Sequence, residues 1–403
     1  MTLQVHNTLS HSLVPFAPRE EGHVRMYVCG PSVYDESHLG HARSYVAYDA
    51  MKRYFLAKGL RVTHVQNFTD VEENITARAK AHDMAPLAWA EHLIRRFFED
   101  MDALRILRAT HYPRVSEHIA EIQALVRALE KKQRAYRYDC RSPVPDGHGL
   151  AAVPAAASDA CDVYFDAEGT PDYGALIGTS IEELAVELPI REQGDRRHPL
   201  DFALWKSRDD WGVTWPSRWG EGRPGWHVEC AAMSHKYLGA DFDIHGGGLD
   251  LVFPHHENER VIGEAAHDAR YCRYYLHNGF VTVGSQKMSK SLGNFATVRE
   301  LLAKHEPEVL RMFLLSAHYR APLNYDEEAI EAARERVDLW RAGAAKAPDE
   351  GACRHEAAFW AAFEDDFHVE RALLAVDQAI ADGSASKRFL REVAAATGLL
   401  WSL

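Results

Sequence analysis

The sequence has no long apolar run, no secretory leader and no regular cysteine framework. A membrane-spanning helix needs about 18 consecutive apolar residues, and no such stretch occurs. The first residues also lack a basic segment followed by an apolar one. The six cysteines are scattered, so we expect free thiols or metal ligands rather than disulfides. These absences predict a cytoplasmic protein with no membrane association.

Basic residues are also in deficit. Lysine and arginine number 46 against 59 aspartates and glutamates, which gives a formal net charge of -13 at pH 7. A chain of this charge has no overall attraction for polyanions, so any contact with nucleic acid needs a local basic face. Apolar residues, by contrast, are plentiful. They make up 46% of the 403 residues, enough for a large core and two to three domains.

Short apolar segments alternate with segments of helical periodicity in the first third of the chain. Residues 25–28 and 61–67 are strand-like, whereas residues 44–55, 85–104 and 115–132 carry apolar side chains at helical spacing. Strands that alternate with helices in this way are typical of α/β proteins with a parallel sheet. We therefore predict a doubly wound parallel sheet.

Changes in composition divide the rest of the chain. Residues 141–160 are rich in Pro, Gly, Ala and Ser and are predicted to form a flexible loop within an insertion. Three helical stretches follow Asp326 and suggest a small bundle. The predicted domains are the first half of the sheet domain, an inserted connective subdomain, the second half of the sheet domain and a helical bundle, at residues 1–125, 126–224, 225–325 and 326–403.

A strand-to-helix turn near the amino terminus carries the first candidate site. Within MYVCGPSVYDESHLGH (residues 26–41), a short apolar strand is broken by Gly30 and Pro31 before the expected helix. The amino end of a helix offers unpaired backbone N–H groups and a positive dipole end, which suit a phosphate group. His38 and His41 lie near this end, three residues apart. A surface or core role explains such a pair equally well.

Thiol, imidazole and carboxylate side chains form the second candidate site. Cys230 lies in GWHVEC, while His255 and Glu259 lie one helical turn apart in HHENE and share a face. Cys29, at the end of the first strand, can join them. All three side-chain types bind zinc, so these four residues are a candidate zinc site. The alternative is two buried apolar thiols and a solvated helix start.

Two loops complete the candidates. In DIHGGGLD (residues 243–250), three glycines that include Gly247 allow the backbone to approach a ligand closely, although such a run is equally a plain loop. In KMSKS (residues 287–291), Lys287 and Lys290 can neutralise charge on transferring phosphates, or they can belong to an ordinary basic turn.

These motifs carry a family resemblance. HLGH and KMSKS resemble the two nucleotide-binding motifs of class I aminoacyl-tRNA synthetases, with Leu39 in place of the usual Ile. Longer segments are similar to cysteinyl-tRNA synthetases, from the amino terminus to about Ala332. These segments are MYVCGPSVYD, NFTDVEEN, GWHVECAAM, DIHGGGLDLVFPHHENE, KMSKSLGNF and HYRAPLNYDEE.

The resemblance implies a Rossmann-type catalytic domain that activates L-cysteine with ATP and magnesium and transfers the cysteinyl group to tRNA(Cys). It also assigns residue roles. It implies one zinc ion on Cys29, Cys230, His255 and Glu259; a cysteine pocket with Trp226, Thr69 and Asp70; ATP contacts from His38, His41, Gly247 and Lys290; and charge stabilisation by His38, His41, Lys287 and Lys290. Because zinc selects a thiolate over a hydroxyl, no editing domain is required.

The sequence also departs from the family. Residues 365–370 read DDFHVE where the family has DDFNTP, TDVEEN replaces the common TDIDDK, and the chain stops where an anticodon-binding domain is expected to begin. These departures leave two other hypotheses open. One is a ligase that passes cysteine to a small amine, as in the mycothiol pathway, and the other is a non-catalytic paralogue that binds cysteine or nucleotide. We expect a monomer in each case.

Overall fold

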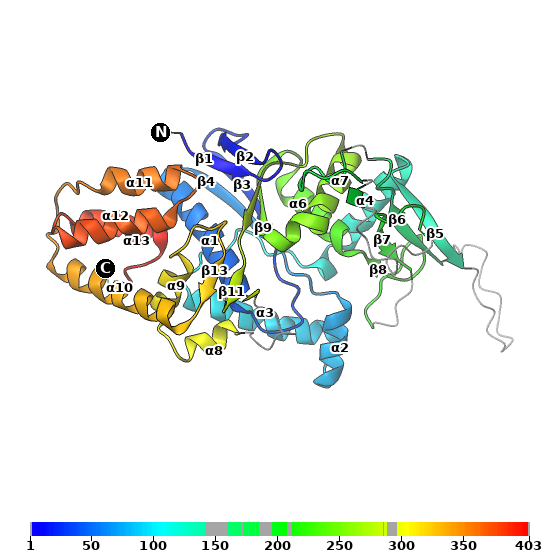
Figure 1. The fold of residues 1–403 in the computed structure, drawn as a ribbon. Coiled ribbons are helices and arrows are strands. Elements are labelled where there is room, and N and C mark those ends of the chain that lie inside the picture. The colour runs from blue at the N-terminus through cyan, green and yellow to red at the C-terminus, as the bar shows by residue number, and fades with distance from the viewer. Residues whose placement is uncertain are drawn as a thin grey trace.

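The computed structural model places a central sheet between an inserted sheet at one end and a helical bundle at the other (Figure 1). It describes residues 2–141, 160–170, 172–181, 183–184, 196–207, 212–284, 286–287 and 296–401. Residues 142–159 of the expected loop and most of the KMSKS motif lie outside these residues. No helix among the described residues is long and apolar enough to cross a membrane.

The central sheet has four parallel strands in the order β10-β9-β3-β4. Its strands are buried on both faces, as is typical of a parallel sheet covered by helices. The strands of the described residues are β1 Gln4–Asn7, β2 Ser12–Pro15, β3 His23–Val28, β4 Arg61–Gln66, β5 Ala135–Arg141, β6 Ala160–Phe165, β7 Phe202–Lys206, β8 Arg223–Pro224, β9 Phe242–Gly248, β10 Cys272–Asn278, β11 Val281–Val283, β12 Gln286–Lys287 and β13 Leu323–Tyr325. The predicted α/β class with a parallel sheet is confirmed.

Helices pack on both faces of this sheet, with α1 on one face and α6 on the other. The helices of the described residues are α1 Leu39–Ala57, α2 Glu73–Ala81, α3 Pro86–Ala103, α4 Ile119–Lys131, α6 Trp226–Leu238, α7 Glu257–His267, α8 Val298–Leu302, α9 Pro307–Leu314, α10 Glu327–Lys346, α11 Glu356–Glu364, α12 Val369–Ala381 and α13 Lys387–Thr397. Short 3-10 turns occupy Val115–Glu117 and Leu249–Leu251, and a π turn occupies Val252–His256. The sheet therefore separates two cores.

Strand alternation decides which core each side chain of β3 enters. Val24, Met26 and Val28 belong to the core that contains α1 and the helical bundle. Tyr27 and Cys29 belong to the other core, which contains residues of α4, α6 and α7. Because successive side chains of a strand point to opposite faces, Cys29 is directed toward α6 and α7. The alternation along β3 therefore places the Cys29 thiol beside residues that lie more than 200 positions away in sequence.

The inserted region forms an antiparallel sheet in the order β5-β6-β7-β8. Cys140 of β5 and Cys161 of β6 are joined by a disulfide, with their Cα atoms 4.1 Å apart. The expectation that the cysteines are free thiols or metal ligands is therefore wrong for this pair. Spacing did not reveal it, because the two residues are brought together by antiparallel pairing. The other four cysteines are buried and free.

The helical region after Asp326 also differs from the prediction. The second of the three predicted helical stretches is divided into α11 and α12. Asp366 and Phe367, in the connection between them, both adopt left-handed backbone angles, with φ of 52° and 54°. A helix cannot continue through such residues. Four helices, α10 to α13, therefore follow β13.

Candidate active site

A cavity of about 360 Å³ lies at the carboxyl ends of all four strands of the central sheet. This edge is where open α/β sheets bind their ligands. Residues at or just beyond the ends of β3, β4, β9 and β10 line it, and the first turn of α1 completes the wall. The lining residues include Cys29, Thr69, Gly248, Asn278, His38, His41, Trp226, Cys230 and His255.

Four candidate metal ligands meet at this cavity. Their ligand atoms, from Cys29, Cys230, His255 and Glu259, all lie within 4.8 Å of one another, and all four residues are buried. His255 Nε2 is 2.9 Å from Glu259 Oε1, and Cys29 Sγ is 3.4 Å from the same oxygen. Two sulfurs, one nitrogen and one oxygen converging at such distances fit a tetrahedral zinc ion. The residues predicted as one site thus converge from the position after β3, from α6, from the π turn and from α7.

Residues behind the ligands fix their orientation. The Tyr271 hydroxyl donates to Glu259 Oε2 over 2.9 Å, and His245 Nε2 lies 3.2 Å from the same oxygen. His255 is oriented in the same way. Its Nδ1 lies 3.0 Å from His227 Nδ1, and its Nε2 therefore faces Glu259. Such second contacts align metal ligands and tune their basicity. The sequence alone predicts no role for Tyr271, His245 or His227. Of the three, only His245 lies within one of the candidate loops, DIHGGGLD.

Several ionisable groups of this cluster are buried together, and their pKa values are shifted by burial and by one another. A hydrogen bond from Cys29 lowers the pKa of Cys230 to about 6, even though burial opposes the shift. Burial raises the pKa of Cys29 well above its usual value. For His255, burial favours the neutral ring, but Glu259 and Cys230 raise its pKa to about 10. The buried ligands thus shift one another's pKa values strongly, as expected of closely spaced ionisable groups.

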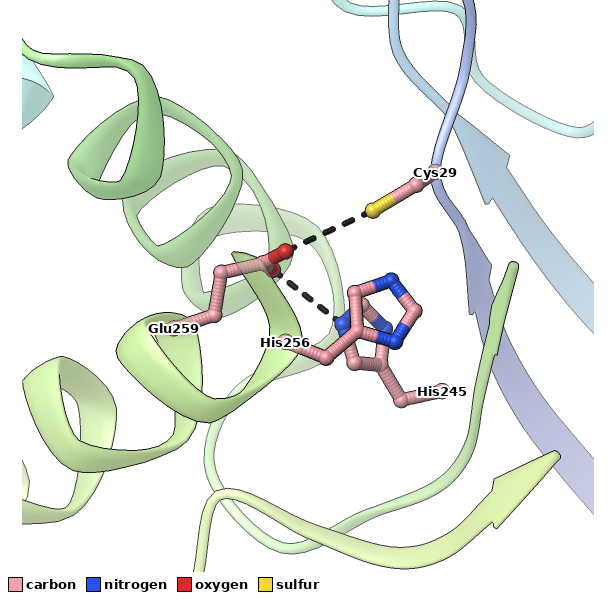
Figure 2. A group of neighbouring side chains, drawn as sticks. All are labelled: Cys29, His245, His256 and Glu259. Carbon is pink, nitrogen blue, oxygen red and sulfur yellow. Dashed lines mark hydrogen bonds and ion pairs between the residues drawn. The ribbon is translucent and has the colours of Figure 1, made fainter. Parts of the chain in front are cut away.

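A second group of potential ligands shares two members with the first. Figure 2 shows Cys29, His245, His256 and Glu259, whose ligand atoms also lie within 4.8 Å of one another. His256 Nδ1 is already 2.8 Å from His277 Nε2. Neither His245 nor His256 lines the cavity, whereas Cys29, Cys230 and His255 do. Only the first group can therefore leave an open coordination position for a molecule that enters the cavity.

The predicted cysteine-pocket residues are divided by the structure. Trp226, 44% exposed, stacks on His255 with ring centroids 4.2 Å apart and lines the cavity. Thr69 lines it as well. Asp70, however, points away from the cavity, because its carboxylate accepts hydrogen bonds from the backbone and hydroxyl of Ser116. Asp70 thus holds a neighbouring loop, and its part in binding cysteine stays a prediction.

His38 and His41 form the amino-terminal cap of α1. His38 Nδ1 accepts from the His41 backbone N–H over 3.2 Å, and His41 Nδ1 accepts from the His38 backbone N–H over 3.3 Å. The two rings stack at 3.6 Å. A neutral ring whose Nδ1 is an acceptor carries its proton on Nε2. Each histidine thus has a donor nitrogen beside a helix terminus that attracts anions.

The remaining candidates for nucleotide binding are Gly247, Lys287 and Lys290. Gly247 is not among the residues that line the cavity; its neighbour Gly248 is. A Cβ on Gly247 would lie 2.8 Å from the His256 ring, so this glycine permits close packing behind the site rather than contact within it. Lys290 and the side chain of Lys287 lie outside the described residues. Their proximity to the cavity stays a prediction.

Comparisons with known proteins agree on one family. The model of the family described as tRNA synthetases class I (C) catalytic domain matches residues 15–335. The chain is 48% identical over 328 residues to a cysteine–tRNA ligase of Desulforamulus reducens, covering 81% of this chain and 63% of that protein. It is 44% identical over 412 residues to a cysteine–tRNA ligase of Thermococcus onnurineus, covering 98% and 82% respectively. The chain thus spans somewhat less than two thirds of the first relative.

Solved structures of other class I synthetases share the fold. A Mycobacterium tuberculosis methionyl-tRNA synthetase in complex with methionyl-adenylate aligns with a TM-score of 0.65 at 18% identity, over 93% of this chain and 87% of that one. A leucyl-tRNA synthetase of Agrobacterium radiobacter, in a ternary complex, aligns with a TM-score of 0.64 at 14% identity, over 95% and 85%. At these identities the likeness concerns the fold alone.

Proposed function

We propose, from the premise that the chain belongs to the cysteine–tRNA ligase family of class I tRNA synthetases, that it activates L-cysteine with ATP and transfers the cysteinyl group to tRNA(Cys). One observation carries the proposal. The four candidate ligands lie at the same cavity as the histidine cap of α1. A thiol-binding metal centre and a phosphate-binding helix end thus face one reaction space.

Zinc is the metal that we assign to Cys29, Cys230, His255 and Glu259. Two thiolates with an imidazole and a carboxylate are a donor set that this ion prefers. When bound, zinc would supply a Lewis acid with affinity for a thiolate, which would favour cysteine over the harder hydroxyl of serine. The chain's own contribution is orientation, because Tyr271 and His227 fix Glu259 and His255 from behind.

The amino acid would lie between the metal centre and α1. Trp226 and Thr69 form walls of the cavity on the side of the metal centre. In this position an oxygen of the cysteine α-carboxylate attacks the α-phosphorus of magnesium-bound ATP. The bond from that phosphorus to the bridging oxygen breaks, and pyrophosphate leaves with the electron pair. Orientation of the two reactants supplies much of the rate.

Charge that develops on the phosphates would be stabilised by four side chains. His38 and His41 offer Nε2 donors at the amino end of α1. Lys287 and Lys290 would add mobile positive charge from the KMSKS loop. Groups of this kind act by electrostatic stabilisation rather than by covalent chemistry. Cys29 and Cys230 are likewise ligands in this proposal and not nucleophiles.

A second cavity offers a place for the acceptor. It measures about 520 Å³ and shares Ser32, Thr69 and Trp226 with the first. Its walls carry the aromatic rings of Tyr164, Phe202 and Trp226, and aromatic rings commonly stack on the bases of single-stranded RNA ends. Cations and carboxylates are mixed in the same walls, and Arg223 is ion-paired with Glu73 at 3.2 Å. A ribose hydroxyl of the terminal tRNA nucleotide placed here could attack the carbonyl of cysteinyl-adenylate and release AMP.

Two assays test the proposal. We expect about one zinc per chain by elemental analysis and cysteine-dependent exchange of pyrophosphate into ATP, with serine at least about a hundredfold less active. Equal exchange with serine, or protein without zinc, would contradict the central claim. The acceptor is tested with ATP, labelled cysteine and either total tRNA or an RNA-free cell extract. Label in acid-precipitable RNA supports tRNA charging, and label only in a small molecule rejects it.

A further inference from the structure

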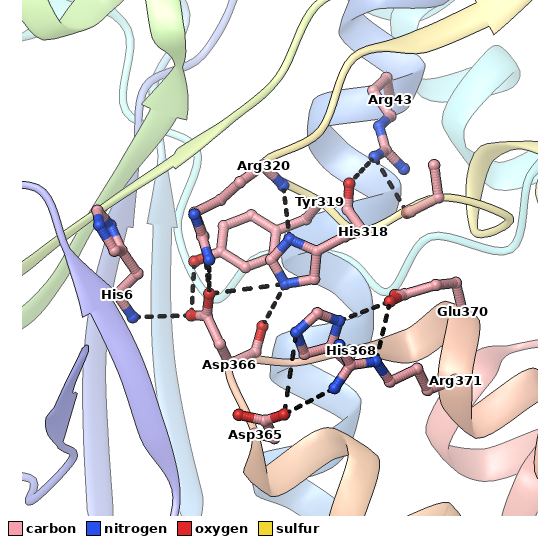
Figure 3. A network of polar contacts seen from close by, with 11 residues as sticks. His6, Arg43, His318, Tyr319, Arg320, Asp365, Asp366, His368, Glu370 and Arg371 are labelled. Carbon is pink, nitrogen blue, oxygen red and sulfur yellow. Dashed lines mark hydrogen bonds and ion pairs between the residues drawn. The ribbon is translucent and has the colours of Figure 1, made fainter. Parts of the chain in front are cut away.

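The DDFHVE segment (residues 365–370), where the sequence departs from its family, forms the connection between α11 and α12. Asp366 lies in this connection and is 1% exposed. Its left-handed backbone is held by the strand β1, because its N–H donates to the Gln4 carbonyl over 3.0 Å. Figure 3 shows the polar contacts around it. A buried carboxylate in a non-helical turn needs several donors to be stable.

Asp366 receives these donors from two other parts of the chain. The His6 backbone N–H donates to Oδ1 over 2.7 Å, and the Tyr319 hydroxyl donates to the same oxygen over 3.0 Å. The Arg320 guanidinium donates to Oδ2 from two nitrogens, each at 2.7 Å. His318 Nε2 is 2.8 Å from the Asp366 carbonyl oxygen. Asp366 therefore ties the bundle to three consecutive residues, 318–320.

His368, which stands where the family has asparagine, lies in the same segment. Its ring lies over that of His318 with centroids 4.1 Å apart, and its Nδ1 is 2.6 Å from Glu370 Oε1. His318 is thus held on one side by the Asp366 carbonyl and covered on another by His368. These contacts leave residues 318–320 little freedom to move relative to the bundle.

Residues 314–318 are in turn hydrogen-bonded to α1, the helix whose first turn carries His38 and His41. Arg43, in the second turn of α1, is 1% exposed, and its guanidinium donates to the carbonyl oxygens of Leu314, Ala317 and His318. The last two distances are 3.1 and 2.6 Å. Arg43 lies two residues after His41. A shift of residues 314–318 would therefore be transmitted to the turn that carries the two histidines.

The first turn of α1 is also bonded to the residues that follow the KMSKS motif. The Leu39 N–H donates to the Ala296 carbonyl over 3.1 Å, and the Val298 N–H donates to the Ser37 carbonyl over 2.8 Å. Residues 296–298 lead through α8 and α9 to Leu314. The helix end, the segment after the lysine motif and residues 314–320 thus form one hydrogen-bonded unit.

We propose that Asp366 is a positioning residue for cysteine activation: through residues 318–320 and Arg43 it fixes the amino end of α1, and with it the Nε2 donors of His38 and His41. The inference rests on the proposed function. Stabilisation of phosphate charge requires donors preplaced at hydrogen-bond distance, so small displacements of α1 lower turnover. The metal centre is held by α6, α7 and β3 and lies outside this chain of contacts.

The test compares Asp366→Ala with Asp377→Ala. Asp377 of α12 also accepts from an arginine and an aromatic N–H, since its carboxylate contacts Arg336 and Trp340, but these contacts stay within the bundle. We expect Asp366→Ala to lower kcat for pyrophosphate exchange about tenfold or more. The KM for cysteine and the zinc content should stay within about twofold of the wild type. Asp377→Ala should lower the melting temperature but preserve kcat.

A milder variant covers the case in which Asp366→Ala does not fold. Asp366→Asn retains an oxygen for Tyr319 and the His6 N–H but removes the charge facing Arg320, so kcat should fall less than in the alanine variant. Equal kcat values in the Asp366 and Asp377 variants, compared per folded molecule, would overturn the inference alone. Loss of zinc or of cysteine affinity in an Asp366 variant would overturn it as well. Absence of exchange in the wild type would instead overturn the proposed function and this inference with it.

Discussion

Two buried carboxylates differ in the groups that surround them. Glu259 lies in the candidate metal site, and Asp366 lies in the connection between α11 and α12, which we call the bundle joint. Both are almost fully removed from solvent, at 0% and 1% exposure. Asp366 is surrounded by donors of the chain itself, the charged group being Arg320. Its charge is thus balanced within the protein, as a buried charge requires.

Glu259 has a different environment. One of its oxygens faces Cys29 and His255, whose atoms are themselves potential ligands, and no lysine or arginine contacts the carboxylate among the described residues. The opposite oxygen accepts from the Tyr271 hydroxyl and also lies 3.2 Å from His245 Nε2. The thiols and imidazoles around Glu259 can themselves bind a divalent cation, whereas the guanidinium that pairs with Asp366 is not a metal ligand. The comparison indicates that the candidate metal site differs from the structural contact in the chemistry of the groups around the buried carboxylate.

The strongest way to break this comparison is Glu259→Gln. The substitution keeps the size of the side chain but removes the charge and weakens one metal bond. We expect zinc content to fall well below one per chain. Cysteine-dependent exchange should fall about a thousandfold, equivalent to about 4 kcal/mol. Zinc is measured by elemental analysis and turnover by pyrophosphate exchange. Retention of both zinc and activity would show that the carboxylate is not a ligand.

The candidate metal site could be predicted only in part from residue types. Cys29 follows a strand, and His255 and Glu259 share a helical face, but spacing left two buried thiols and a solvated helix start as the alternative, and the family resemblance decided between them. Strand alternation then directs Cys29 toward α6 and α7. The exact partners behind the ligands were not predictable. Tyr271 approaches Glu259 only because the residue before β10 packs against α7.

The bundle joint was missed for a related reason. Residues 356–382 have helical periodicity throughout and contain no glycine or proline near the break. The left-handed angles of Asp366 and Phe367 are selected by contacts with β1 and residues 318–320, which lie far away in sequence. Tertiary contacts here override local propensity. The contact between Asp70 and Ser116 was likewise not predictable, because the two residues lie 46 positions apart.

A third buried carboxylate, Asp49, resembles Asp366 in being paired with arginine, and its contribution to folding stability can be measured. Asp49 of α1 is ion-paired with Arg311 and Arg53 and accepts the Leu107 N–H over 2.8 Å. We expect Asp49→Asn to lower the free energy of unfolding by about 3 kcal/mol, because it leaves buried Arg311 without its counter-charge. Zinc content should be unchanged. The free energy is measured by denaturant titration, and loss of zinc from folded protein would contradict the separation of the two regions.

The same pair predicts a pH dependence. Burial favours the protonated form of Asp49, but Arg311 and Arg53 outweigh burial and lower its pKa. A lowered pKa stabilises the fold at pH values above the unfolded-state pKa and loses this effect as the pH falls through the folded-state value. The stability difference between wild type and Asp49→Asn should therefore be constant near neutral pH and shrink below about pH 4. A difference that grows in acid would contradict this assignment.

The smallest expected effect concerns the open side of the metal centre. Trp226 covers His255 yet is 44% exposed, so it is the wall that a bound amino acid would bury further. Trp226→Ala removes a large contact surface without removing a ligand. We expect the KM for cysteine to rise about tenfold, equivalent to about 1.4 kcal/mol of binding free energy. Zinc content should remain near one per chain, and kcat should change less than KM because the phosphate donors lie on α1. Trp226→Phe, which keeps an aromatic face on His255, serves as the matched control and should recover most of the affinity. If both variants instead lost zinc, Trp226 would belong to the support of the metal centre, and the boundary drawn here between its buried ligands and its open wall would be wrong.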